Sequence, residues 1–227
     1  MPSINSLDEM PRRELHVFYV LDTSKSMEGA KINALNHAME ESMETLKTFA
    51  KNSDIKLKIA VMEFNTGCRW ITSNGPEDLE EGFKYEYLEA GGLSDMGAAL
   101  KELNSKLSRH AFLNSKTGVL RPIIIFVTDG YSTDDYVKAL EEIRKNKWYA
   151  RGKKIGFALG DDSDVKMLSS IVGNSEAVIK TTDFDLFKNL MKYVFMPTSV
   201  VHLGDDKYNI EQDPPVTTDD VWDDSVW

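Results

Sequence analysis

The residues best suited to chemistry in this 227-residue chain are an aspartate and two serines in the stretch DTSKS, residues 22–26. Asp22 ends an apolar run, and Ser24 and Ser26 follow it at alternate positions. In a tight loop, such alternate side chains can point toward one centre. Carboxylate and hydroxyl oxygens with no His or Cys among them suit a hard cation, and Mg²⁺ better than a closed Ca²⁺ cage.

Two later segments supply similar groups. The run IIIFVTDG places Asp129 at the end of a second apolar strand, and the turn GGLSDMG offers Ser94 and Asp95 before a helical pattern. Because ligands bind beyond the carboxyl ends of strands in open α/β sheets, these groups and Asp22 are expected at one rim. The alternative is that the acids and serines only cap the helices that follow them. Three motifs in order favour a divalent metal site.

The surrounding pattern predicts the elements that position these groups. Apolar runs alternate with segments whose apolar residues recur every three or four positions, as on one face of a helix. The turn at residues 65–67 predicts a hairpin and one antiparallel strand at a sheet edge. The expected strands are 15–21, 55–65, the hairpin partner from 68, a short one around 83–88, 123–127, 154–159 and 177–180. The expected helices are 31–52, one capped by Ser94 or Asp95, 134–147, 165–171 and 183–195. This order predicts a doubly wound α/β fold with a mostly parallel central sheet and helices on both faces.

At these motifs the chain resembles the von Willebrand factor A domain family, with its metal-ion-dependent adhesion site. The family pattern is matched by DTSKS, by the GGLSDMG turn and by VTDG, over roughly residues 12 to 196. The resemblance implies a Rossmann-like fold in which Ser24, Ser26 and Ser94 touch the metal, while Asp22 and Asp129 act largely through bound water. It also implies a protein partner whose Asp or Glu completes the coordination.

The second motif departs from the family pattern. Leu93 is an extra residue, and Ser94 stands where Thr is usual. Either Ser94 or Asp95 could therefore face the metal. Ser94 is favoured because the Met-Gly-Ala-Ala-Leu that follows then falls into the family register, and Asp95 is left as a candidate partner-binding residue.

A narrower resemblance is to the small cytoplasmic bacterial TerY-type proteins of tellurite-resistance and related stress or defence clusters. It is carried by RRELHVFYVLDTSKSMEGAKINALNHAM and GGLSDMGAAL. That resemblance implies a PP2C-like phosphatase and a protein kinase as partners. The ion is expected to be Mg²⁺, with Mn²⁺ or Ca²⁺ as alternatives.

Composition bounds the other possibilities. Residues 204–227 hold eight acids and one lysine, and so carry −7 of the net charge of −10. No basic cluster is present, which argues against a nucleic-acid partner. The single Cys68 excludes an internal disulfide, which suits a reducing compartment. The N-terminal residues have no apolar signal core and no apolar run is long enough to span a membrane, so we expect a cytoplasmic protein.

The expected domain organisation has three parts. Residues 1–12 are an N-terminal extension, 13–197 form the domain, and 198–227 form an acidic tail expected to be disordered. The tail repeats an Asp-Asp, Val-Trp theme, so Trp222 and Trp227 could anchor it to a partner protein. The alternative is an extension that only improves solubility.

Enzyme classes fit less well. A phosphatase of the haloacid-dehalogenase type needs a second acid two positions after the first, where this chain has Ser24. No glycine-rich phosphate loop follows the first strand. The sequence therefore favours a non-enzymatic, metal-dependent binding module or adaptor, with an accessory subunit of an AAA+ machine and a Mg²⁺-dependent phosphatase as alternatives.

Overall fold

A seven-stranded sheet forms the centre of the computed structural model, which describes residues 12–72, 75–79 and 83–194. The strand order is β3-β2-β1-β5-β6-β7, and β4 pairs with β2. The strands are β1 Arg13–Asp22, β2 Ile55–Asn65, β3 Gly67–Trp70, β4 Glu77–Asp78, β5 Ile123–Thr128, β6 Lys153–Leu159 and β7 Val178–Thr181. The α-helices are α1 Ala30–Lys51, α2 Met96–Lys106, α3 Tyr136–Ile143, α4 Lys147–Arg151, α5 Val165–Val172 and α6 Phe184–Tyr193. Short 3₁₀ helices span Lys25–Met27 and Ser175–Ala177.

The central strands are buried on both faces, which explains their continuous apolar composition. All six residues of β5 are buried, as are the last eight of β1, and the two strands run parallel with Val17 opposite Ile123. Strands β2, β6 and β7 continue the parallel arrangement on either side. The predicted fold class is therefore confirmed.

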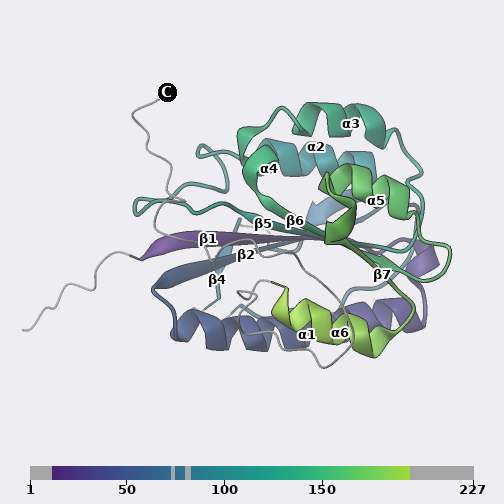
Figure 1. Ribbon diagram of the computed structural model, residues 1–227, viewed down its shortest axis with the longest axis horizontal. Helices are drawn as coiled ribbons and strands as arrows, with labels where there is room; N and C mark the ends of the chain where they lie inside the picture. The colour runs from purple at the N-terminus through teal and green to yellow at the C-terminus, as the bar shows by residue number, and fades with distance from the viewer. Residues whose placement is uncertain (1–11, 73–74, 80–82, 195–227) are drawn as a thin grey trace, which may run out of the picture.

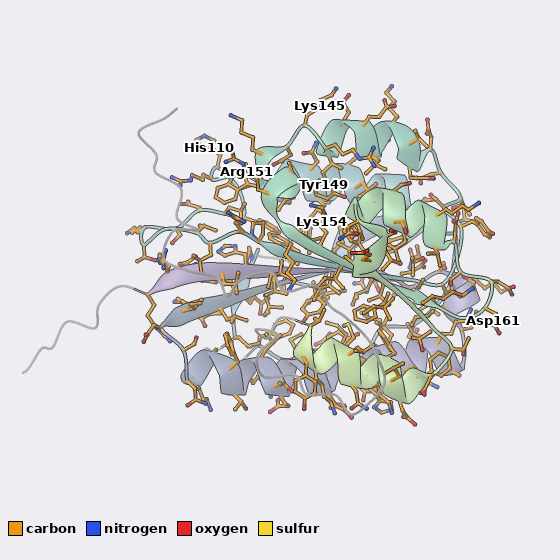
Figure 2. All side chains as sticks on the ribbon, viewed as in Figure 1. His110, Lys145, Tyr149, Arg151, Lys154 and Asp161 are labelled. Carbon is orange, nitrogen blue, oxygen red and sulfur yellow. The ribbon has the colours of Figure 1, made fainter. Side chains whose placement is uncertain are left out.

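Helices cover both faces of the sheet (Figure 1). Helices α1 and α6 lie together on one face, and α2, α3, α4 and α5 lie on the other. Tyr149 of α4 is buried between this second helical layer and the sheet. The Lys154 ammonium lies over its ring, with Nζ 4.9 Å from the ring centre (Figure 2). Each helical layer therefore encloses its own apolar cluster around one shared sheet.

The predicted hairpin is confirmed. Strands β2 and β3 pair antiparallel, with Phe64 opposite Cys68, and β3 forms one edge of the sheet. The two-residue strand β4 also pairs antiparallel with β2, which the sequence did not predict. The short strand expected around 83–88 is wrong: this segment is irregular, and at its end the backbone N–H and carbonyl of Leu88 bond to the Asn36 side chain of α1 instead of to a strand.

The helix expected over 134–147 is wrong in extent. The chain forms α3 and then a separate short α4, because the Asn146 side chain accepts hydrogen bonds from the amides of Trp148 and Tyr149 and starts a new helix. Strand β1 begins at Arg13. The expected domain end at 197 and the tail 198–227 lie outside the described residues, as does nearly all of the extension 1–12.

Candidate functional site

The site lies where two neighbouring parallel strands end. Asp22 is the last residue of β1, and Asp129 directly follows β5. After β1 the chain builds β2 on one side of it and later β5 on the other, so the strand order reverses between β1 and β5. Loops leaving the two strands there turn to opposite faces of the sheet, which opens a position for a ligand.

The Asp22 carboxylate shapes the loop that follows it. Asp22 Oδ1 accepts a hydrogen bond from the backbone N–H of Ser24 at 2.8 Å. A 3₁₀ turn follows and inserts Met27, which is fully buried, into the core. Gly29 then takes a positive φ of 82° before α1 begins. The loop is thereby fixed with the serine hydroxyls near Asp22.

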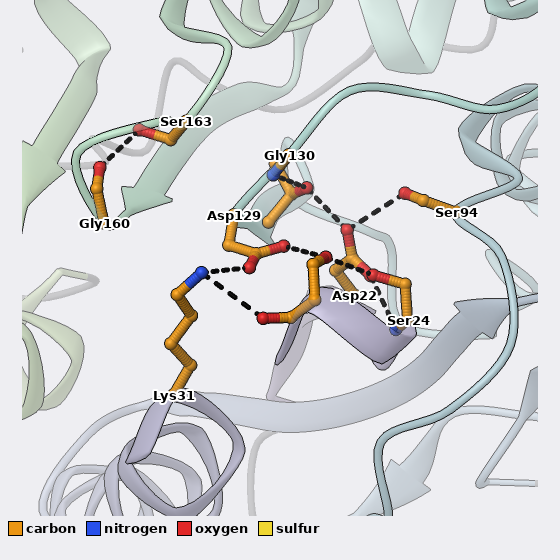
Figure 3. A network of polar contacts seen from close by, with 10 residues as sticks. Asp22, Ser24, Lys31, Ser94, Asp129, Gly130, Gly160 and Ser163 are labelled. Atoms are coloured by element: carbon orange, nitrogen blue, oxygen red, sulfur yellow. Dashed lines mark hydrogen bonds and ion pairs between the residues drawn. The ribbon is translucent and has the colours of Figure 1, made fainter. Parts of the chain in front are cut away.

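The five predicted metal-site side chains are brought together, and we refer to Asp22, Ser24, Ser26, Ser94 and Asp129 as the strand-end site (Figure 3). Ser26 Oγ donates to Asp129 Oδ1 at 2.7 Å and lies 3.0 Å from Ser24 Oγ. Ser94 Oγ donates to Asp22 Oδ2 at 3.1 Å. Three segments separated in sequence therefore meet in one network of hydroxyls and carboxylates.

Ser94 and Asp95 have different surroundings. The Asp95 carboxylate is turned to the β2–β3 turn and to a neighbouring loop, where it accepts hydrogen bonds from Gly67 N at 2.8 Å and from Thr133 Oγ1 at 2.9 Å. Among the described residues, the Asp95 side chain makes no hydrogen bond to a side chain of the strand-end site. The Ser94 hydroxyl, in contrast, bonds to Asp22. Of the two candidates, Ser94 is the one that belongs to the network.

The predicted position of the α2 N-cap is confirmed at Asp95, but the predicted capping side chain is wrong. Asp95 occupies the N-cap position, but neither it nor Ser94 makes a side-chain cap. The capping group is Asp134, from the loop after β5, whose carboxylate accepts hydrogen bonds from Gly97 N at 2.7 Å and Ala98 N at 2.8 Å. Asp95 is thus free to join the loops, and Asp134 ties the third motif to the second.

The two carboxylates of the strand-end site are buried, whereas one of its serines is exposed to solvent. Asp22 is fully buried and Asp129 is 3% exposed, while Ser26 is exposed. Burial raises the pKa of the Asp22 carboxyl, and the nearby charge of Asp129 adds to this, although hydrogen bonds from Ser24 and Thr128 oppose it. A positive charge placed between the two carboxylates would relieve this cost.

Two residues that the sequence did not place among the predicted metal-site residues, Thr128 and Lys31, also bond to the carboxylates of the site. Thr128 Oγ1 donates to Asp22 Oδ2 at 2.6 Å, so it orients the carboxylate instead of merely ending β5. Lys31, in the first turn of α1, pairs with Asp129. The position of Thr128 beside Asp129 was a usable signal, but nothing in the sequence placed Lys31 near a strand that follows it by almost a hundred residues.

Two large apolar side chains lie exposed on loops that carry strand-end residues. Leu93 is 53% exposed and Tyr131 is 67% exposed. Their loops are joined, because Thr133 N donates to Ser94 O at 2.8 Å. Exposed apolar groups beside a polar site are typical of surfaces that bind other proteins. The tail residues Trp222 and Trp227 lie outside the described residues.

The donor set fits a hard divalent ion. Each serine hydroxyl can donate its hydrogen to a carboxylate or a neighbouring hydroxyl and still offer a lone pair to a cation. Within the described part of the chain no cluster of three or more His, Cys, Asp or Glu side chains could hold a metal, so a site here depends on hydroxyl oxygens. The same part of the chain contains no helix that is both long enough and apolar enough to cross a membrane.

The fold and site together define an α/β domain with an oxygen-lined site at its topological switch point. The model of the von Willebrand factor type A domain family matches residues 16–192, and the chain belongs to that family.

Solved structures agree in fold. A von Willebrand factor type A protein from Catenulispora acidiphila is 17% identical, with a TM-score of 0.56 over 80% of this chain and 42% of that one. The ArnB paralog VWA2 from Sulfolobus acidocaldarius is 17% identical, with a TM-score of 0.58 over 79% of this chain and 44% of that one. Proximal thread matrix protein 1 from the mussel byssus, solved with a zinc-occupied metal-ion-dependent adhesion site, is 16% identical, with a TM-score of 0.55 over 80% of this chain and 44% of that one. This chain therefore spans less than half the length of each of these proteins.

Proposed function

We propose that this protein is a metal-dependent protein-binding module that holds a divalent ion in the strand-end site. The observation that carries the proposal is the single network of three serine hydroxyls and two carboxylates drawn from three separate loops. Ser24, Ser26 and Ser94 would contact the ion through their hydroxyl oxygens, and Asp22 and Asp129 would hold it through water. The ion would supply a positive centre for an acidic group from outside.

The proposed ion is Mg²⁺, with Mn²⁺ or Ca²⁺ as alternatives. The zinc bound by the mussel protein supports a divalent ion in this type of site. In this chain the donors are all oxygens, which favours Mg²⁺ over zinc, since zinc prefers nitrogen and sulfur ligands. With few direct anionic ligands, the ion would remain strongly attracted to an additional carboxylate.

The proposed partner is a protein that offers an Asp or Glu next to apolar side chains. The exposed Leu93 and Tyr131, on loops of the site, supply the apolar contacts. Asp95 would act indirectly, since its carboxylate supports these loops. Trp222 and Trp227 in the acidic tail would anchor a second contact with a partner.

The proposed setting is the bacterial cytoplasm, in a stress or defence pathway of the TerY type with a protein kinase and a PP2C-like phosphatase. The resemblance of the first two motifs supports this assignment. The alternative role, as an accessory subunit of an AAA+ machine, would use the same site. The two roles differ in the partner protein that the site binds.

The geometry argues against a phosphatase that uses Asp22 as its nucleophile. The Asp22 carboxylate is fully buried and accepts hydrogen bonds from Ser24 N, Ser94 Oγ and Thr128 Oγ1. A buried carboxylate whose oxygens accept these hydrogen bonds is held in place and is poorly available to attack a substrate. In addition, Ser24 stands where such a phosphatase has the acid that transfers the proton.

The test is affinity capture from a lysate of the source organism, in Mg²⁺ or in EDTA, with the wild type and Asp22→Ala. We expect a specific protein, identified by mass spectrometry, that only the wild type retains and only with Mg²⁺. Equal recovery under all four conditions would contradict metal-gated capture. Mg²⁺-dependent phosphatase turnover that Asp22→Ala abolishes would replace the proposal with the enzyme.

A further inference from the structure

The strand-end site contains a cation of its own. Lys31 Nζ pairs with Asp129 Oδ2 and lies 3.3 Å from the backbone oxygen of Ser26. The other carboxylate oxygen of Asp129 accepts the Ser26 hydroxyl at 2.7 Å. In Figure 3 Lys31 and Asp22 lie on opposite sides of the Asp129 carboxylate. The ammonium therefore approaches Asp129 from outside the network, and the oxygen on the network side stays with the serine.

The position of the ammonium is restricted by its surroundings. The side chain of Lys31 is 29% exposed, whereas that of Asp129 is 1% exposed. The stem passes close to Gly160 in the loop after β6, where an added Cβ would lie 3.3 Å from Lys31 Cε. Gly160 has a φ of 94°, and its carbonyl is held by the Ser163 hydroxyl at 2.9 Å. A larger residue at 160 would press on the lysine stem.

The charges of the site follow from this pair. Asp22 and Asp129 alone give a charge of −2 in a buried place, and Lys31 reduces it to −1. Opposite charges at short range stabilise each other, and a cation repels a second cation that approaches it. Lys31 therefore stabilises the site without metal and also repels an incoming divalent ion. Once an ion is bound, the net charge is +1 instead of 0, which attracts an external carboxylate.

We propose that Lys31 is a tethered counter-cation of Asp129, which stabilises the metal-free site and lowers its affinity for the divalent ion. Lys31 is a positioning residue, since it acts through Asp129. This inference rests on the proposed function for the existence of the metal site, but the effect on the metal-free protein can be measured independently.

A second lysine provides a matched control. Lys56 Nζ lies 2.6 Å from Asp78 Oδ2, with side chains 31% and 3% exposed, so the pair has nearly the same burial as Lys31 and Asp129. Lys56 is near the start of β2, at the opposite end of the strand from the site. Loss of Lys56 should destabilise the fold to a similar degree without changing the metal site.

The experiment uses the full chain as wild type, Lys31→Met, Lys56→Met and the double variant Lys31→Met/Asp129→Asn. Thermal unfolding in EDTA measures the metal-free state, and calorimetric titration with MgCl₂ measures the affinity. We expect both single variants to melt below the wild type in EDTA. Lys31→Met should bind Mg²⁺ about tenfold more tightly, because one repulsive unit charge is removed at short range, whereas Lys56→Met should bind as the wild type does.

The double variant guards against a variant that fails to fold. It removes both charges of the pair, so it should regain stability in EDTA relative to Lys31→Met and should lose Mg²⁺ binding. If the wild type binds Mg²⁺ and Lys31→Met binds it equally or more weakly, the inference about Lys31 is overturned while the proposed function stands. A wild type that shows no Mg²⁺ binding would contradict the proposed function, and the inference would fail with it.

Discussion

Ser94→Ala and Asp95→Ala change adjacent residues, and we expect Asp95→Ala to lower the stability of the fold and Ser94→Ala to weaken metal binding. Asp95 accepts hydrogen bonds from Gly67 N and Thr133 Oγ1, which join the β2–β3 turn to the loop after β5. Each hydrogen bond to a charged group contributes roughly 1.5–3 kcal/mol, and the partial exposure of Asp95 reduces this, so the loss of both bonds together should cost about 2–3 kcal/mol. For a domain of this size that corresponds to a Tm lower by roughly 4–12 °C.

Ser94→Ala should affect folding less. Asp22 loses one donor but keeps Thr128 Oγ1 at 2.6 Å and Ser24 N at 2.8 Å. The expected cost is about 1 kcal/mol. Its effect should instead appear with metal, because a proposed direct ligand is gone. At a Mg²⁺ concentration near 100 times the Kd, binding stabilises a protein by about 2.7 kcal/mol.

The assay is thermal unfolding in EDTA and in MgCl₂ at a concentration that saturates the wild type. Asp95→Ala should melt well below the wild type in EDTA and should retain most of the rise with Mg²⁺. Ser94→Ala should melt close to the wild type and lose most of the rise. The reverse pattern, with the Mg²⁺ effect lost in Asp95→Ala and kept in Ser94→Ala, would refute the assignment of Ser94 to the site.

Three further predictions follow from the described contacts. Burial raises the pKa of the Cys68 thiol from 9.0 to about 11, and nearby carboxylates add to this. At pH 8 the alkylation of Cys68 should therefore be about 100-fold slower in the folded than in the unfolded chain, and its rate should rise about tenfold per pH unit. Equal alkylation rates in the folded and unfolded chains would contradict this prediction. Gly97→Ala would place a Cβ 2.8 Å from Asp134 Oδ2, so denaturant unfolding should show a loss of about 2 kcal/mol as this cap is displaced, whereas an unchanged midpoint would show that the loop adapts freely. Asn36→Ala removes hydrogen bonds to both backbone groups of Leu88 and should cost about 2–3 kcal/mol, with protease cleavage near residue 88 as the readout; uncleaved, fully stable protein would contradict it.

Much of the fold was predictable because local patterns and long-range packing agree. The apolar run of β1 and the turn around Thr66 specify a buried strand and a hairpin without knowledge of distant contacts. The irregular segment 83–88 was not predictable, since its apolar residues pack while its backbone bonds to Asn36. The break between α3 and α4 depended on one residue, Asn146, whose side chain caps the second helix.

The site was predictable as far as its motifs extend. Asp22 and Asp129 share a rim because parallel neighbours end together, and this follows from strand order alone. The cap that Asp134 gives to α2 and the pairing of Lys31 with Asp129 depend on how loops fold over one another. Such contacts leave no periodic pattern in the sequence, so only the structure reveals them.

The most direct test of the central claim is calorimetric titration of the full chain with MgCl₂, for the wild type and Ser26→Ala. Ser26 is exposed, so its hydroxyl can be removed with little effect on the core. We expect one Mg²⁺ per wild-type chain and an affinity at least tenfold lower for Ser26→Ala, which is about 1.4 kcal/mol. Absence of binding by the wild type, or equal binding by both proteins, would contradict a metal site built from these residues.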